Sequence, residues 1–174
     1  MKRLISAIMT VAIIFFALVT VQGQKLKLRN GYEYFAQDGA IGVRYSTGLK
    51  GPVLEPEYEY VFPYGGNFVG VKEGDFYITL GGDFVLQGPF DRILFSSKNL
   101  VCATRNGRAL IIINWGDGDI EITETDFKTC YPVDDPYHKL FAVERTDGKK
   151  SLFCKETGKV ILPFVDGGYH HLWS

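Results

Sequence analysis

The densest group of chemically useful side chains lies in residues 58–64, where aromatic rings alternate with carboxylates and a proline. Tyrosine offers a flat apolar surface with a hydrogen-bonding tip. Proline cannot donate to a strand ladder, so it favours an edge or a turn, where side chains stay accessible to a partner. We therefore expect a recognition surface formed by Tyr58, Glu59, Tyr60 and Tyr64. Filling of the protein core is the alternative use of these aromatic rings.

Two further groups of side chains have the types that bind metal ions. The first holds Asn114, Asp117, Asp119 and Glu121; the second holds residues 134–138, Asp-Asp-Pro-Tyr-His, and the pair His170 and His171. Oxygen ligands suit Ca²⁺, but the spacing of the first group is not that of a twelve-residue calcium loop. Aspartate and glycine are also ordinary turn residues. We interpret both groups as solvated turns and tails, and we predict neither a metal nor another cofactor.

The sequence lacks the local patterns that accompany the common catalytic chemistries. It contains no Gly-x-Ser-x-Gly, no His-Glu-x-x-His and no phosphate-binding glycine loop. Aspartate and glutamate are plentiful, and a pair of them is all that a glycoside hydrolase requires. We expect a protein without enzymatic activity, with a secreted hydrolase as the alternative.

Composition narrows the class of protein. Among 174 residues, 19 Lys and Arg balance 20 Asp and Glu, which argues against a dedicated nucleic-acid binder. Hydrophobic residues make up 46% and aromatic residues 14% of the chain, as expected for a folded domain that is rich in strands.

The N-terminal segment has the pattern of an export signal. Lys2 and Arg3 precede an uncharged apolar run, and Val21-Gln22-Gly23 fits a signal-peptidase site. We place a signal peptide at residues 1–23, with an uncleaved membrane anchor as the alternative. The rest of the chain is then exported to the periplasm, the cell surface or the medium, and has no stable membrane span after cleavage.

Four related units follow, each built around a polar–glycine turn. The anchoring glycines are Gly39, Gly74, Gly107 and Gly148, and the units span approximately 32–63, 68–96, 100–132 and 140–166. Each unit reads as strand, tight turn, strand, second turn and strand, with no helical periodicity after residue 24. We predict an all-β domain over residues 24–174, in which units of about three antiparallel strands form a curved meander or solenoid-like array. A small four-bladed propeller is the alternative.

Export would permit disulfides, but three cysteines cannot all pair within one chain. Alignment of the units places Cys130 and Cys154 on core-facing positions, and Cys102 on the opposite face with Gly70 and Ala142. Buried free thiols, and one disulfide with a free thiol, both fit the sequence.

The repeated pattern resembles bacterial WG repeats, also called KWG repeats. The resemblance covers roughly residues 32–166 and is carried by residues 56–59, Pro-Glu-Tyr-Glu, 88–91, Gly-Pro-Phe-Asp, and 162–164, Leu-Pro-Phe. The repeats are degenerate, since the one literal Trp-Gly pair, Trp115-Gly116, lies out of register with the family motif. The resemblance implies a β-repeat scaffold without a general enzymatic activity. We expect an exported binding or scaffold module whose partner is a protein or a cell-envelope glycan.

Overall fold

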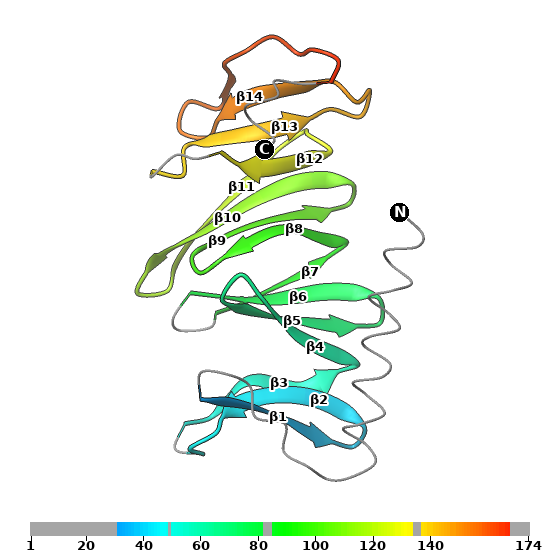
Figure 1. Ribbon diagram of the computed structural model, residues 1–174, viewed down its shortest axis with the longest axis vertical. Coiled ribbons are helices and arrows are strands. Elements are labelled where there is room, and N and C mark those ends of the chain that lie inside the picture. Colours follow the sequence, from blue (N-terminus) through cyan, green and yellow to red (C-terminus); the bar gives the residue numbers. More distant parts are fainter. Residues whose placement is uncertain (1–30, 49, 82–84, 134–136, 168–174) are drawn as a thin grey trace. The chain divides into compact units, whose positions relative to one another are not determined.

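The computed structural model describes residues 31–48, 50–81, 85–133 and 137–167. All regular secondary structure in these residues consists of β-strands, which confirms the predicted all-β class (Figure 1). The strands are β1 (Tyr32–Gln37), β2 (Ala40–Tyr45), β3 (Pro52–Tyr58), β4 (Tyr60–Tyr64), β5 (Asn67–Lys72), β6 (Asp75–Leu80), β7 (Val85–Phe90), β8 (Arg92–Ser97), β9 (Leu100–Arg105), β10 (Arg108–Gly116), β11 (Asp119–Glu124), β12 (Thr129–Pro132), β13 (Leu140–Glu144), β14 (Lys150–Cys154) and β15 (Lys159–Val160). The predicted signal peptide lies outside the described residues.

The strands form four sheets in which neighbours in sequence are neighbours in space. Their orders are β1-β2-β3, β4-β5-β6-β7, β11-β10-β9-β8 and β12-β13-β14-β15. The first sheet has the three strands that the sequence predicts for a unit. Each of the others has four, because β4, β8 and β12 pair with the strand that follows them.

The described residues contain no apolar helix of the length that a membrane crossing requires.

The four anchoring glycines occupy equivalent hairpin turns, as predicted. All four have a positive φ, between +73° and +86°. At the first three, the preceding residue also has a positive φ, which gives the two-residue loop that suits the twist of a hairpin. The fourth turn is one residue longer: Arg145 and Lys149 flank a loop in which only Gly148 has a positive φ. The polar–glycine turn therefore recurs in the backbone of all four repeats, with one extra loop residue in the fourth.

The chain divides into two compact parts, which are named unit 1 and unit 2 and differ from the four repeated units of the sequence. Unit 1 contains residues up to 62 and residues 70–72, and unit 2 contains residues 63–69 and everything from residue 73. In unit 1, the first sheet contributes three buried hydrophobic side chains, those of Val43, Leu54 and Tyr58. Tyr58 leaves no space for a side chain at position 70, since a Cβ atom on Gly70 would lie 2.4 Å from its ring.

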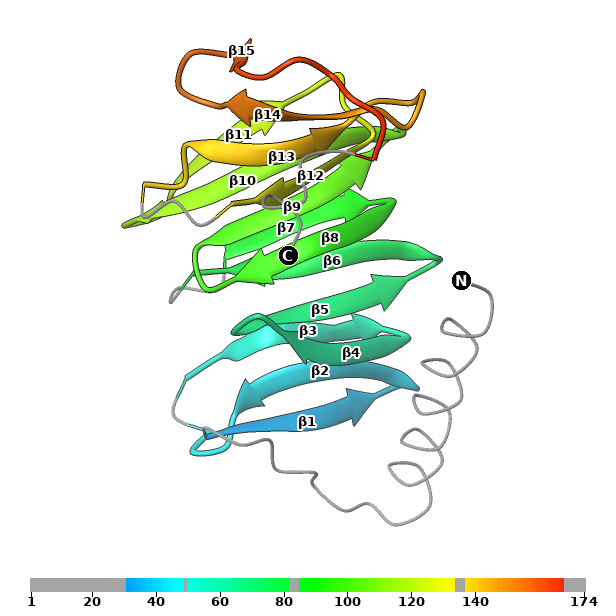
Figure 2. The ribbon, with the colours of Figure 1, turned by 45° about the horizontal axis from the view of Figure 1, so that its top comes forward.

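Unit 2 is built around a sheet, β8–β11, that is buried on both faces. One face of β9 and β10 packs with β12–β14 in a cluster that includes Ile111, Cys130 and Phe141. The other face packs with Val69 and with side chains of β6 and β7. Figure 2 shows β12 and β13 beside β9 and β10 within this unit. Burial on both sides explains why Leu110 to Ile113 form an uninterrupted apolar run, since alternation is expected only where one face meets water.

The structure corrects two of the three cysteine assignments. Cys130 is fully buried, as predicted. Cys102 lies on the same face as Cys130, not on the opposite one, because the hairpin pairs Cys102 with Ile111. Cys154 is only partly buried. Its neighbour Phe153 belongs to the cluster and Cys154 does not, so Cys154 faces away from this part of the core.

Candidate functional site

The structure separates the four residues of the sequence-predicted surface. Tyr58 is 1% exposed and belongs to the core of unit 1, so its assignment to a binding surface is wrong. The physical reason is a bend at Glu59, whose backbone N–H donates to the carbonyl of Val71 at 2.8 Å. The bend ends β3 at Tyr58 and begins β4 at Tyr60, so one alternating strand does not run through both.

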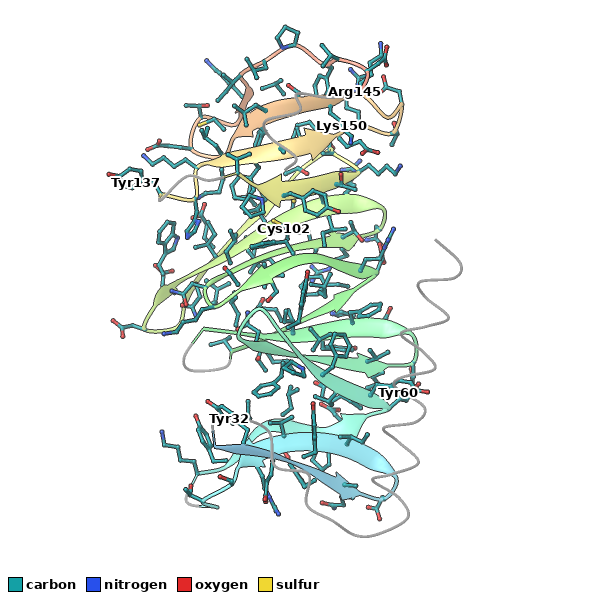
Figure 3. All side chains as sticks on the ribbon, viewed as in Figure 1. Tyr32, Tyr60, Cys102, Tyr137, Arg145 and Lys150 are labelled. Atoms are coloured by element: carbon teal, nitrogen blue, oxygen red, sulfur yellow. The ribbon has the colours of Figure 1, made fainter. Side chains whose placement is uncertain are left out.

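The other three residues remain accessible to different degrees. Glu59 is exposed, Tyr60 is partly buried, and Tyr64 is 39% exposed. Glu59 and Tyr60 belong to unit 1, where Figure 3 shows Tyr60, and Tyr64 belongs to unit 2. Each stays a candidate for binding within its own unit.

The candidate metal ligands do not gather. Within the part of the chain that the structure describes, no group of three His, Cys, Asp or Glu side chains could hold a metal ion. Asp117, in the turn between β10 and β11, and Asp119, the first residue of β11, are exposed, whereas Glu121 bonds to other side chains. Asp134, Asp135, His170 and His171 lie outside the described residues.

The structure instead brings together three side chains that we name the Trp115 cluster: Trp115, Glu121 and Lys155. The indole Nε1 of Trp115 donates to Glu121 Oε2 at 2.9 Å. The Nζ atom of Lys155 donates to both carboxylate oxygens, at 2.6 Å and 2.8 Å. The same Nζ lies 5.6 Å from the centre of the indole ring. Each of the three side chains therefore contacts the other two.

The backbone of β10 turns Trp115 outward. Asn114 pairs with Ile120 and Gly116 pairs with Asp119, so Trp115 is the extra residue of a β-bulge. Such a bulge redirects a side chain and is common beside functional sites. The Oδ1 atom of Asn114 accepts a 2.8 Å hydrogen bond from the N–H of Gly116 and so bridges the bulge. Trp115 is 55% exposed in this position.

A second exposed aromatic ring belongs to the adjoining chain segment. The N–H of Lys155 donates to the carbonyl of Lys139 at 2.8 Å, which holds the segment 137–139 beside β14. Lys139 Nζ lies 5.6 Å from the ring centre of Tyr137 and 2.8 Å from Glu156 Oε2. Tyr137 is 69% exposed and projects from the edge of unit 2 in Figure 3.

The electrostatics of the cluster favour positioning over proton transfer. The pKa of Glu121 lies below its usual value. The hydrogen bond from Lys155 is the largest cause of this shift, and the hydrogen bond from Trp115 is the second largest. Glu121 is therefore an ionised acceptor at neutral pH and a poor general acid. The side chain of Lys155 is 9% exposed, so most of it is shielded from solvent. The arrangement fixes an indole ring whose remaining surface faces solvent.

Sequence reasoning missed this site although it considered two of the residues separately. Glu121 appeared as a calcium ligand, and Trp115 as an out-of-register Trp-Gly pair. The available signal was a large aromatic residue directly before the turn residues Gly116, Asp117 and Gly118, where a core position is unexpected. Lys155, 34 positions after Glu121, had no local signal.

Comparison with known proteins adds no relative from which a role could be transferred: no family model matches the chain, and no curated protein matches it.

Proposed function

We propose that the chain is an exported, non-enzymatic binding module, and that its Trp115 cluster stacks against a glycan of the cell envelope. The exposed, hydrogen-bonded indole of Trp115 is the observation that carries this proposal. A flat ring in a fixed orientation suits the apolar face of a sugar, because little side-chain entropy is lost on binding. The resemblance to WG repeats supports a scaffold that presents such a surface.

The charges around the indole favour a neutral sugar over a polyanion. Lys155 is paired with Glu121, and Lys139 is paired with Glu156 at 2.8 Å. Each cation thus already has a carboxylate partner, and binding of an anionic polymer would have to displace it. Tyr137 adds a second ring and a hydroxyl group on the adjoining segment.

Cosedimentation tests the proposal. The chain without residues 1–23 is mixed with purified bacterial cell-wall sacculi and with an insoluble neutral glucan, and the bound fraction is measured against protein concentration. We expect retention on at least one of them, and the variant Trp115→Ala to bind about tenfold more weakly, a loss of about 1.4 kcal/mol. Its melting temperature should change by no more than about 2 °C, since the ring is exposed.

Two controls locate the surface. Tyr64→Ala removes another partly exposed ring of unit 2 and should leave retention unchanged, and Tyr60→Ala does the same in unit 1. Loss of retention in these variants, with Trp115→Ala unaffected, would transfer the site to the segment that the sequence predicts. Absence of retention on both polysaccharides would refute glycan binding, and release of reducing ends from either would refute a non-enzymatic role.

A further inference from the structure

Two cysteines from different sheets meet in the core of unit 2. Cys102 lies on β9 and Cys130 on β12, and both are fully buried. They belong to one apolar cluster with Ile111, Phe141 and Val143. The strands β9 and β12 contact each other within this unit (Figure 2). The two thiol groups interact through their side chains, and this interaction is, after burial, a further cause of the raised pKa of Cys102.

The surroundings of the pair are apolar. Cys130 Sγ donates to the carbonyl oxygen of Leu110 at 3.6 Å. Both thiols are free in the structure. A covalent bond between the two sulfur atoms would replace a weak thiol–thiol contact inside this cluster.

We propose that Cys102 and Cys130 form a disulfide that links the sheet β8–β11 to the sheet β12–β15. The reaction is thiol–disulfide exchange with a disulfide-carrying oxidant. The thiolate of one cysteine attacks the oxidant and releases one of its thiols, and the second cysteine then attacks the mixed disulfide and releases the other. Two protons and two electrons leave the pair, and the oxidant is reduced to two thiols.

The bond must form before the core closes. Burial, followed by the hydrogen bond to Cys130, raises the pKa of Cys102 well above its usual value, so the folded chain holds almost no thiolate there. Cys154 is the contrasting thiol, since it is partly exposed and hydrogen bonds from Thr157 lower its pKa. In the folded, reduced chain Cys154 is therefore the thiol that reacts first with an added reagent.

Counting of thiols tests the proposal on the full exported chain. The protein is folded in the presence of oxidised and reduced glutathione, or isolated from an oxidising compartment, then denatured and alkylated without reductant. We expect one alkylated residue, Cys154, and, in a sample taken before alkylation, a mass about 2 Da lower than that of the reduced chain. Peptide mapping should give one linked pair that contains Cys102 and Cys130 and that separates on reduction.

Variants distinguish this bridge from its alternatives. Cys154→Ser should keep the linked pair, whereas Cys102→Ala should leave Cys130 and Cys154 both open to alkylation. The oxidised chain should melt about 6–12 °C above the reduced chain, as expected for a closed loop of this length. Three alkylated residues in the wild-type chain after folding in glutathione and denaturation, or a bridge that contains Cys154, would overturn the proposal.

Discussion

The side-chain amide of Asn114 donates a 3.2 Å hydrogen bond to the backbone carbonyl oxygen of Leu80. Asn114 lies on β10 and Leu80 ends β6, so this bond joins two successive sheets through residues that both belong to unit 2. The fit is close, because a Cβ atom on Gly81 would lie 2.2 Å from the amide nitrogen of Asn114. The same side chain bridges the bulge at Trp115 through its bond to Gly116. One buried asparagine thus connects the packing of the sheets to the candidate site.

Replacement of this asparagine should affect stability and binding together. Asn114→Ala leaves the carbonyl of Leu80 without this donor, which should lower the free energy of unfolding by about 1–3 kcal/mol. It should also weaken glycan retention, because the bulge loses its bridge. Urea unfolding and cosedimentation measure the two effects.

Asn99 supplies the matched control. It is exposed, and its backbone carbonyl, which any residue would provide, accepts the N–H of Asn114 at 2.8 Å. Asn99→Ala should change the unfolding free energy by no more than about 0.5 kcal/mol. Equal effects of the two variants on the unfolding free energy would show that the Asn114 side chain contributes no more to stability than an exposed side chain does.

A second prediction concerns the close approach of Gly70 to Tyr58 in unit 1. Gly70→Ala places a methyl group against the ring of Tyr58, which is 1% exposed, so it should destabilise the chain by about 1–3 kcal/mol. Gly51→Ala is the control, since a Cβ atom there meets no atom within 4 Å. Chemical unfolding of both variants checks the prediction, and equal stability of the two would contradict the packing described for Tyr58.

Local signals in the sequence account for the parts of the fold that could be predicted. Polar–glycine pairs such as Asn106-Gly107 fix two-residue hairpin loops, and these set both the strand count and the register. Counting residues outward from that loop pairs Cys102 with Ile111. The sequence therefore could have predicted that these two side chains share a face of the sheet. Alignment of whole units assigned Cys102 to the other face because it ignored the pairing within the hairpin.

The candidate site depends on contacts that no local pattern encodes. The Trp115 cluster combines β10 and β11 with a lysine from the turn after β14, which belongs to another sheet. A single sequence does not show which turns of two sheets meet. The buried state of Tyr58 has a similar cause, since only the bend at Glu59 separates it from the more exposed residues of β4.

A third prediction follows from the ion pair between Arg44 and Glu33 in unit 1. The atoms Arg44 Nε and Glu33 Oε1 are 2.7 Å apart, and the Glu33 side chain is almost fully buried. Arg44→Met keeps the aliphatic stem but leaves a buried carboxylate without this cation, which should lower the unfolding free energy by about 1–3 kcal/mol. The double variant Glu33→Gln, Arg44→Met should recover part of the loss.

The exposed pair Lys72–Glu57, at 2.8 Å in the same unit, is the control for this ion pair. Lys72→Met should lower the unfolding free energy by no more than about 0.5 kcal/mol, because solvent screens an exposed pair. If Lys72→Met and Arg44→Met were equally destabilising, burial of Glu33 would not be the reason for the effect.

The last prediction uses the lowered pKa of Glu121 in the Trp115 cluster. Because the folded chain binds the Glu121 proton more weakly than the unfolded chain, this carboxylate stabilises the fold above its ordinary pKa of 4.5. That stabilisation decreases as the pH falls below 4.5 and is lost once the folded-state carboxylate is protonated. A carboxyl ¹³C titration should therefore give a midpoint for Glu121 below 4.5. Lys155→Met removes the largest cause of the shift and should raise the midpoint, and Trp115→Phe, which removes only the indole donor, should raise it less. A wild-type midpoint at or above 4.5 would contradict the hydrogen-bonded cluster, and with it the fixed orientation of the indole on which glycan stacking depends.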